Sequence, residues 1–223
     1  MIALVFVPTR STMPSYGGRS AESWLRDVFS TASSGNSQTA AIEAFREMGT
    51  NGIVFLVEAL NRRDNTWDRF YQRVFAKLPP VLRQKMPRPV YASALASAAI
   101  LVLFNVRDTA PEQTLPRLAR LLSASNPRTR LDAASVLKHY DQNHPGLDIA
   151  RFRSELIPVL NDENDWTRIE VATVLDTARL GGPELIPALK PALTNSSPLI
   201  RSAAQAIVDH LEAANATARS HAP

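Results

Sequence analysis

Two short sequence patterns alternate along this chain, and they limit the folds that it can adopt. In the first pattern, Ile or Leu precedes Pro and further leucines follow, at residues 115–118, 157–160 and 186–189. In the second, Arg leads into a stretch of Ala and other aliphatic residues, at 130–137, 168–175 and 201–207. Together the patterns repeat every ~30–40 residues, a period typical of stacked pairs of helices. We therefore expect an all-α fold, an α-α superhelix of about four helical pairs with a C-terminal capping helix.

The composition supports helices that surround a buried core. Hydrophobic residues make up 45% of the 223 residues, which excludes a chain disordered throughout. Only 8 residues are glycine and 7% are aromatic, which argues against an all-β protein. The chain has no cysteine, and this excludes disulfides, thiolate metal sites and a cysteine nucleophile.

The same patterns divide the chain into three parts. We expect an extended or disordered segment at 1–19, the helical array at 20–213 and a disordered tail at 214–223. An irregular insert at 61–90 interrupts the array, because it contains four prolines, at positions 79, 80, 87 and 89. Within the insert the apolar spacing predicts a helix from Trp67 to Leu78, which Pro79 ends.

Elsewhere, apolar spacing and cap residues set the expected helices. They lie at 20–29, 39–48, 53–60, 91–106, 111–123, 127–140, 147–160, 165–180, 183–193 and 198–213. Residues 49–52 contain two glycines and form the predicted turn between the second and third of these helices. Asn126 and either Asn164 or Asp165 are the expected N-caps of two later helices.

The alternating patterns resemble HEAT repeats, members of the armadillo-type α-solenoids. Pro116, Pro158 and Pro187 stand near the start of each second helix, where a missing N–H costs little. The clear resemblance covers about residues 91–213, and a weaker match at 40–60 has Val54 in place of the expected proline. The segment 16–25 is similar to the lead-in of HEAT-repeat proteins of unknown function from bacteria of the Verrucomicrobia type. The resemblance implies a fold and a concave binding face, but no particular role, because HEAT repeats serve many.

The insert is strongly basic. Between residues 62 and 88, eight Lys or Arg stand against two Asp, so this segment carries a charge of +6 in a chain whose net charge is +4. Arg69, Arg73 and Lys77 follow a spacing of four, which places them on one face of a helix. The candidate binding residues of the insert are Arg69, Arg73, Lys77, Arg83, Lys85 and Arg88. They suit an acidic protein partner or nucleic-acid phosphates, or they form a solvated face with the insert's aromatic residues packed inward.

A second set of candidate binding residues comes from the resemblance, which implies that the second helix of each pair lines the concave face. That face would present Arg117, Arg120, Arg153 and Lys190 and would be mildly basic, as an acidic peptide or helix requires. Trp166 is a further candidate, either as an exposed anchor for a partner or as a side chain seated between neighbouring repeats.

The sequence contains no recognisable catalytic set. The four histidines lack metal-ligand spacing, and there is no Gly-rich phosphate loop and no Ser-His-Asp set. The acidic run 162–165 is an inter-helix turn with an N-cap, or a cation site. We therefore expect no cofactor, no bound metal and no enzymatic activity.

The N-terminal run Ile2–Val7 is apolar but far shorter than the ~20 residues of a membrane span. We expect a cytoplasmic protein, or an anchored or exported one if this run is the remnant of a longer anchor.

From the sequence we thus expect a scaffold that binds a protein partner, an acidic peptide or helix, through the concave face and the basic insert. The alternative is a nucleic-acid-associated protein that binds phosphates through residues 62–88. A third option is an enzyme, since some HEAT-like solenoids are DNA glycosylases or lyases.

Overall fold

The protein is mostly helical, as the sequence predicts. The computed structural model describes residues 13–28, 35–106, 111–144 and 146–220. Within these ranges, strand occurs only in a small hairpin, in which β1 (Ser15–Tyr16) pairs antiparallel with β2 (Arg19–Ser20). The fold class is therefore all-α. Residues 1–12, part of the predicted N-terminal segment, and 221–223, the end of the predicted tail, lie outside the described residues.

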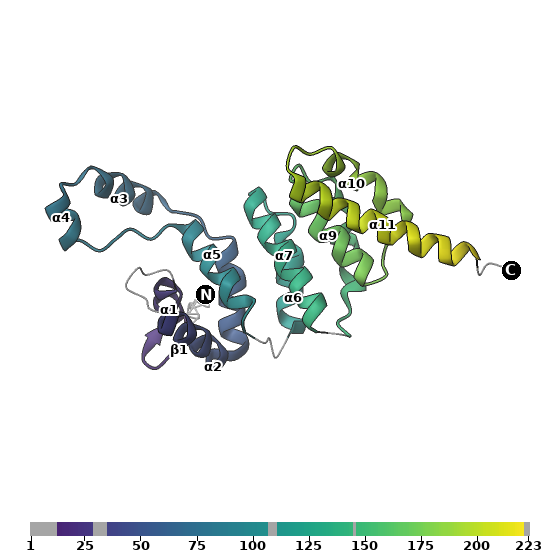
Figure 1. Cartoon of the computed structure of the whole chain (residues 1–223). Helices are drawn as coiled ribbons and strands as arrows, with labels where there is room; N and C mark the ends of the chain where they lie inside the picture. Colours follow the sequence, from purple (N-terminus) through teal and green to yellow (C-terminus); the bar gives the residue numbers. More distant parts are fainter. Residues whose placement is uncertain (1–12, 29–34, 107–110, 145, 221–223) are drawn as a thin grey trace, which may run out of the picture.

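The helices follow one another along the chain with short connections (Figure 1). Their bounds are α1 Ala21–Asp27, α2 Gly35–Leu60, α3 Thr66–Lys77, α4 Pro80–Lys85, α5 Ala92–Leu103, α6 Pro111–Leu121, α7 Pro127–Asn143, α8 Arg153–Leu156, α9 Asp165–Thr177, α10 Ile186–Leu193 and α11 Pro198–Ser220. Three 3-10 helices, η1 Ile149–Phe152, η2 Ile157–Asn161 and η3 Pro183–Leu185, complete the set.

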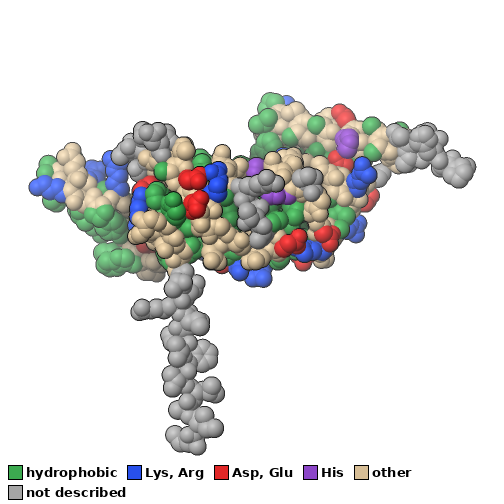
Figure 2. Space-filling model, turned by 90° about the horizontal axis from the view of Figure 1, so that it is seen from below, with side chains coloured by type: hydrophobic (Ala, Val, Ile, Leu, Met, Phe, Trp, Pro, Cys, Tyr) green, Lys and Arg blue, Asp and Glu red, His purple; other side chains and the backbone are tan. Residues whose placement is uncertain are grey.

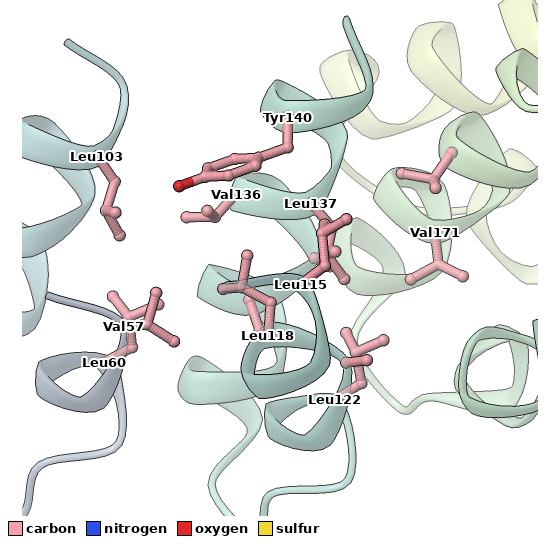
Figure 3. Packing of buried hydrophobic residues seen from close by; sticks show 14 of the residues in the cluster. Val57, Leu60, Leu103, Leu115, Leu118, Leu122, Val136, Leu137, Tyr140 and Val171 are labelled. Atoms are coloured by element: carbon pink, nitrogen blue, oxygen red, sulfur yellow. The ribbon is translucent and has the colours of Figure 1, made fainter. Parts of the chain in front are cut away.

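Apart from α3 and α4, the helices pack mainly against their neighbours in the chain. α2 packs on α1, α5 and α6, α7 packs on α6 and α9, and α9 packs on α10 and α11. The result is an elongated row of helices with a hydrophobic core that runs through it (Figure 1). Figure 3 shows the central part of this core, where Val57 and Leu60 of α2 face Leu115 and Leu118 of α6. The apolar residues of both sequence patterns supply this core, which is why the patterns predict the helices well.

One polar contact is repeated at three of the turns that precede a helix. Arg130 donates to the backbone oxygen of Ala124 over 3.0 Å, and Arg201 donates to that of Asn195 over 2.7 Å. Arg168 makes the corresponding bond to the backbone oxygen of Asp162. In each case the acceptor stands six residues before the arginine. The arginine that opens each second-pattern segment therefore fixes the turn that leads into its own helix.

Side-chain caps explain where two of these helices begin. The Asn126 side chain accepts a hydrogen bond from the N–H of Arg128, and the Asn164 side chain accepts one from that of Thr167. Both bonds satisfy amide groups that have no partner within the helix. The predicted cap at Asn126 is confirmed, and of the two candidates for the later cap it is Asn164 that serves.

The helices predicted at 39–48 and 53–60 are joined more closely than the predicted turn at 49–52 suggests. Helix continues on both sides of Gly49, which alone leaves helical geometry, with φ 57° and ψ −143°. Only glycine adopts these angles readily, since a Cβ would meet the backbone. The break lets Phe45 and Phe55, on opposite sides of it, lie with their ring centres 6.3 Å apart.

Two predictions about the helices were wrong. The expected helix at 147–160 is divided into η1, α8 and η2, with Pro158 near the start of η2. The predicted disordered tail is helical as far as Ser220, in a stretch rich in the strong helix former alanine. Within the insert at 61–90, the helix predicted from Trp67 to Leu78 is confirmed as α3, and the short helix α4 follows it.

Candidate functional site

A groove lies between α6 and the segment formed by η1, α8 and η2. Its volume is about 660 Å³. Apolar groups line most of it, from Pro116, Ala119 and Leu122 on one side and Phe152, Pro158 and Val159 on the other. Pro116 and Pro158, the prolines of two first-pattern segments, therefore line the same space.

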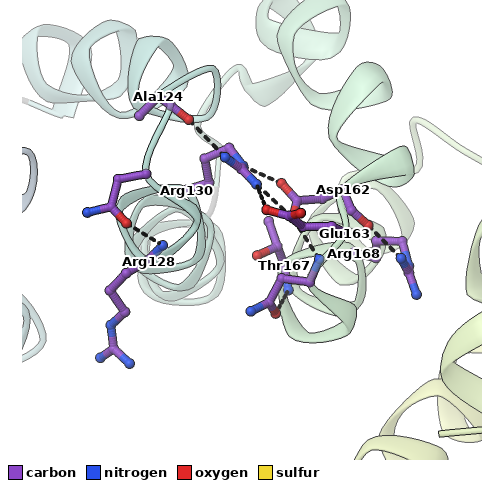
Figure 4. Close-up of polar contacts among 9 residues, drawn as sticks. Ala124, Arg128, Arg130, Asp162, Glu163, Thr167 and Arg168 are labelled. Atoms are coloured by element: carbon purple, nitrogen blue, oxygen red, sulfur yellow. Dashed lines mark hydrogen bonds and ion pairs between the residues drawn. The ribbon is translucent and has the colours of Figure 1, made fainter.

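An ion-pair network contributes Arg130 and Asp162 to the lining of this groove. Arg130 binds the carboxylate of Asp162 through two of its nitrogens and that of Glu163 over 3.2 Å (Figure 4). The hydrogen bond that Arg130 donates to Asp162 raises the pKa of Arg130 above its already high value, although partial burial opposes this. Asp162 also accepts the N–H of Asn164 over 2.8 Å. The network joins the start of α7 to the turn before α9, so it holds two successive helices of the row together.

The four basic residues predicted for the concave face differ in their availability. Arg117 forms an ion pair with Glu58 over 3.0 Å, and Arg153 donates to the backbone oxygen of Leu180 over 3.0 Å. Arg120 is exposed, lines the groove and forms no ion pair or side-chain hydrogen bond with any described residue. Lys190 is exposed on α10, outside the groove lining. Arg120 is therefore the member of this set that the groove offers to a ligand.

The basic residues of the insert lie elsewhere, in an arm that leaves the row at one end (Figure 1). We use the name arm for residues 61–90. Arg69, Arg73 and Lys77 are exposed on one face of α3, and Lys85 and Arg88 are exposed around the end of α4. The Arg83 side chain closes α3 by donating to the backbone oxygen of Leu78 over 2.8 Å. Of the predicted site residues, Arg120 thus lines the groove and six lie on the arm. Arg117, Arg153, Trp166 and Lys190 belong to neither surface.

The expectation that the insert's aromatic residues pack inward was wrong for two of them. Trp67 and Phe70 are exposed, with ring centres 5.5 Å apart, because no helix of the row packs over this face of α3. Trp166 is half-buried and packs against the hydrophobic core. Trp24 packs there too and donates its indole N–H to the backbone oxygen of Tyr16 over 3.1 Å. Of the three tryptophans, Trp67 is the one left open to a partner.

A second, more polar pocket of about 520 Å³ lies where the arm joins the row. Arg62, Arg63 and Arg128 line it together with Asp64 and Asp132. Asp64 accepts the N–H of Ala92 over 2.8 Å and so caps α5. Asp132 is buried and pairs with the exposed Arg128 over 2.8 Å. Burial raises the pKa of Asp132, although the charge of Arg128 acts against it. No simple sequence pattern points to this carboxylate, because its burial depends on α2 and α5.

The raised pKa of Asp132 predicts how stability depends on pH at this residue. Because its pKa is higher in the folded than in the unfolded chain, its stabilising effect is present at low pH and is lost as the pH rises through the folded pKa. Asp132→Asn does not titrate, so at neutral pH we expect it to match or exceed the wild type in stability. As the pH falls, the stability of the wild type should rise relative to that of Asp132→Asn. Thermal unfolding of both proteins between pH 3 and pH 7 measures this difference. Asp209→Asn, at an exposed carboxylate, is the control. A clear loss of stability in Asp132→Asn at neutral pH contradicts this account.

No group of three or more His, Asp or Glu side chains in the described ranges is placed to hold a metal ion. None of the helices in that part of the chain is long and apolar enough to cross a membrane. No protein-family model matches the chain, and no protein with curated annotation matches it.

Proposed function

We propose that this protein is a HEAT-like α-solenoid that acts as a scaffold and binds a peptide segment of a partner protein. The observation that carries the proposal is the apolar groove between α6 and α8, with Arg120 on its rim. A volume of about 660 Å³ is within the range of ligand-binding clefts.

The repeated turn contact supports the solenoid part of the proposal. Arg130, Arg168 and Arg201 bond to carbonyl groups at the same sequence distance, in three turns that precede equivalent helices. The helices also pack chiefly on chain neighbours. Both features are expected of a quasi-one-dimensional array, in which each repeat contacts only the next.

The chemistry of the groove indicates what kind of peptide fits. Its apolar walls favour hydrophobic side chains, whose transfer from water drives binding. Among its charged groups, Arg130 and Asp162 already neutralise each other, and Glu155 is an exposed carboxylate beside Ser154. Arg120 forms no ion pair with any residue that the structure describes. The ligand expected is therefore a short segment with hydrophobic side chains and one Asp or Glu positioned at Arg120.

A displayed peptide library selected against the purified protein tests this proposal. We expect enriched peptides that combine hydrophobic residues with an acid and that lose about tenfold or more in affinity on Arg120→Glu. Ser154→Trp, which fills the groove from an exposed position, should abolish binding. Ser202→Trp, at an exposed serine of α11, is the matched control and should bind normally. Enriched peptides that bind Ser154→Trp as well as the wild type would rule the groove out.

Nucleic-acid binding through the arm is the second candidate. It is favoured by one observation, that Arg69, Arg73 and Lys77 project into solvent and form no ion pair or side-chain hydrogen bond with any described residue. Binding of this kind weakens steeply as salt is added, because each phosphate contact releases a counterion. A filter-binding titration with single-stranded DNA over a range of salt concentrations measures that dependence.

A further inference from the structure

The arm combines an exposed hydrophobic face with a basic one. On α3, Trp67 and Phe70 are 71% and 53% exposed, and on α4 Val81 is 65% exposed. Val74, Leu82 and Met86 are also exposed, and no residue of either helix is buried. Large hydrophobic side chains gathered in this way usually mark a surface that another body covers.

The arm is a formed structure and not a frayed loop. A reciprocal capping box between Asn65 and Asp68 starts α3, and Arg83 closes its other end. The hydroxyl of Tyr71 donates to the backbone oxygen of Pro87 over 2.6 Å and so ties the returning chain to α3. The arm therefore holds the exposed hydrophobic side chains of α3 and α4 in a fixed shape, and none of these belongs to the core.

The charge of the arm indicates what covers it. From residue 69 to residue 90 there are six Lys or Arg and no acid. The two carboxylates at its base, Asp64 and Asp68, are taken up by helix caps. In Figure 2 Lys or Arg side chains and hydrophobic side chains lie next to each other at this end of the molecule. The partner must therefore be both apolar and negatively charged.

We propose that the arm binds an anionic lipid surface, with Trp67, Phe70 and the exposed residues of α4 entering the acyl boundary and the basic residues lying among the headgroups. This combination of a Lys- and Arg-rich face with Trp, Phe and Leu is that of helices that lie in a membrane interface. Nucleic acid would use the charges and stack on the aromatic rings, but it would leave the aliphatic Val74, Val81 and Leu82 in water. The arm also projects away from the row, so a flat surface reaches it freely (Figure 1). The inference is independent of the groove.

Vesicle binding by the full chain tests the proposal. The probes are vesicles of phosphatidylcholine with and without phosphatidylglycerol, and co-sedimentation gives the affinity. We expect binding to the anionic vesicles, and a loss of about 100-fold when Arg69, Arg73 and Lys77 are all changed to Glu. Trp67→Ser with Phe70→Ser should also weaken binding by about tenfold or more, since it removes the inserted side chains. All five residues are exposed, so unchanged circular dichroism and thermal unfolding confirm that the variants are folded.

Controls of the same chemistry lie outside the arm. The first control, Arg120→Glu with Lys190→Glu, reverses two exposed charges. The second, Leu199→Ser, removes an exposed hydrophobic residue of α11. Both control variants should bind vesicles as the wild type does. On binding, tryptophan emission should shift to shorter wavelength in the wild type and not in Trp67→Phe. Suppose that the triple change of Arg69, Arg73 and Lys77 to Glu abolishes vesicle binding while Trp67→Ser with Phe70→Ser keeps full affinity. In that case the contact is purely electrostatic and the proposal is wrong. The proposal is equally wrong if the protein does not bind the vesicles and the arm binds single-stranded DNA or a protein instead.

Discussion

Leu118→Ala is expected to lower the free energy of unfolding by about 3 kcal/mol, within the 2–5 kcal/mol range of buried leucine truncations. Leu118 is fully buried in α6, in the part of the core where α2, α6 and α7 meet (Figure 3). Truncation of the Leu118 side chain removes apolar contacts where α2, α6 and α7 meet. It also leaves a cavity that the neighbouring helices fill only in part. Denaturant unfolding followed by circular dichroism measures the change.

The matched control is Leu199→Ala in α11, where the leucine is 65% exposed. This change should alter stability by no more than about 0.5 kcal/mol, because little apolar surface is returned to water. Equal effects of the two substitutions would mean that α6 does not occupy the centre of a shared core.

Asp162→Ala is expected to lower the free energy of unfolding by about 3 kcal/mol, because it removes the buried partner of Arg130 and leaves only the exposed Glu163 to balance that charge. The Asp162 side chain is only 4% exposed, and it binds both Arg130 and the N–H of Asn164 (Figure 4). The substitution should therefore loosen both the start of α7 and the turn before α9. Hydrogen exchange should rise at both places together.

Glu163→Ala is the control for this effect, since Glu163 contacts the same Arg130 but its side chain is 72% exposed. Exposed ion pairs contribute little, so a loss of about 0.5 kcal/mol or less is expected. If Glu163→Ala costs as much as Asp162→Ala, burial is not what gives the network its strength.

Sequence periodicity was a good guide to the row of helices because the residues that carry it form the core. Pro127 at the start of α7 and the cap at Asn164 act locally, so their effects are visible in a single sequence. The break at 147–160 was harder to foresee. A proline at the first or second position of a helix is compatible with helix, and only the packing of this segment decides between α and 3-10 geometry.

The arm shows the limit of pattern alone. The spacing of apolar residues from Phe70 to Leu78 predicts an amphipathic helix, and α3 forms. Whether the apolar face is covered depends on where the chain places the helix, and here it stands clear of the row. The position of α3 relative to the row depends on contacts between residues distant in sequence, such as the cap that Asp64 provides to α5.

The candidate binding residues divide in a similar way. Arg120 was predicted from its place in the repeat, and it does line the groove. Arg117 and Arg153 have the same kind of position in the repeat. However, Arg117 forms an ion pair with Glu58, and Arg153 donates a hydrogen bond to the backbone oxygen of Leu180. Spacing therefore identifies the face on which a side chain stands, whereas its availability depends on the tertiary fold.

Tagged purification from the native host, after nuclease treatment, tests most directly the claim that this protein is a scaffold whose groove binds a partner. Wild type, Ser154→Trp and the control Ser202→Trp are compared by quantitative mass spectrometry. The account predicts a defined set of proteins that survives nuclease, is retained by Ser202→Trp and is lost from Ser154→Trp. Proteins that disappear with nuclease, or that Ser154→Trp captures as well as the wild type does, would contradict it.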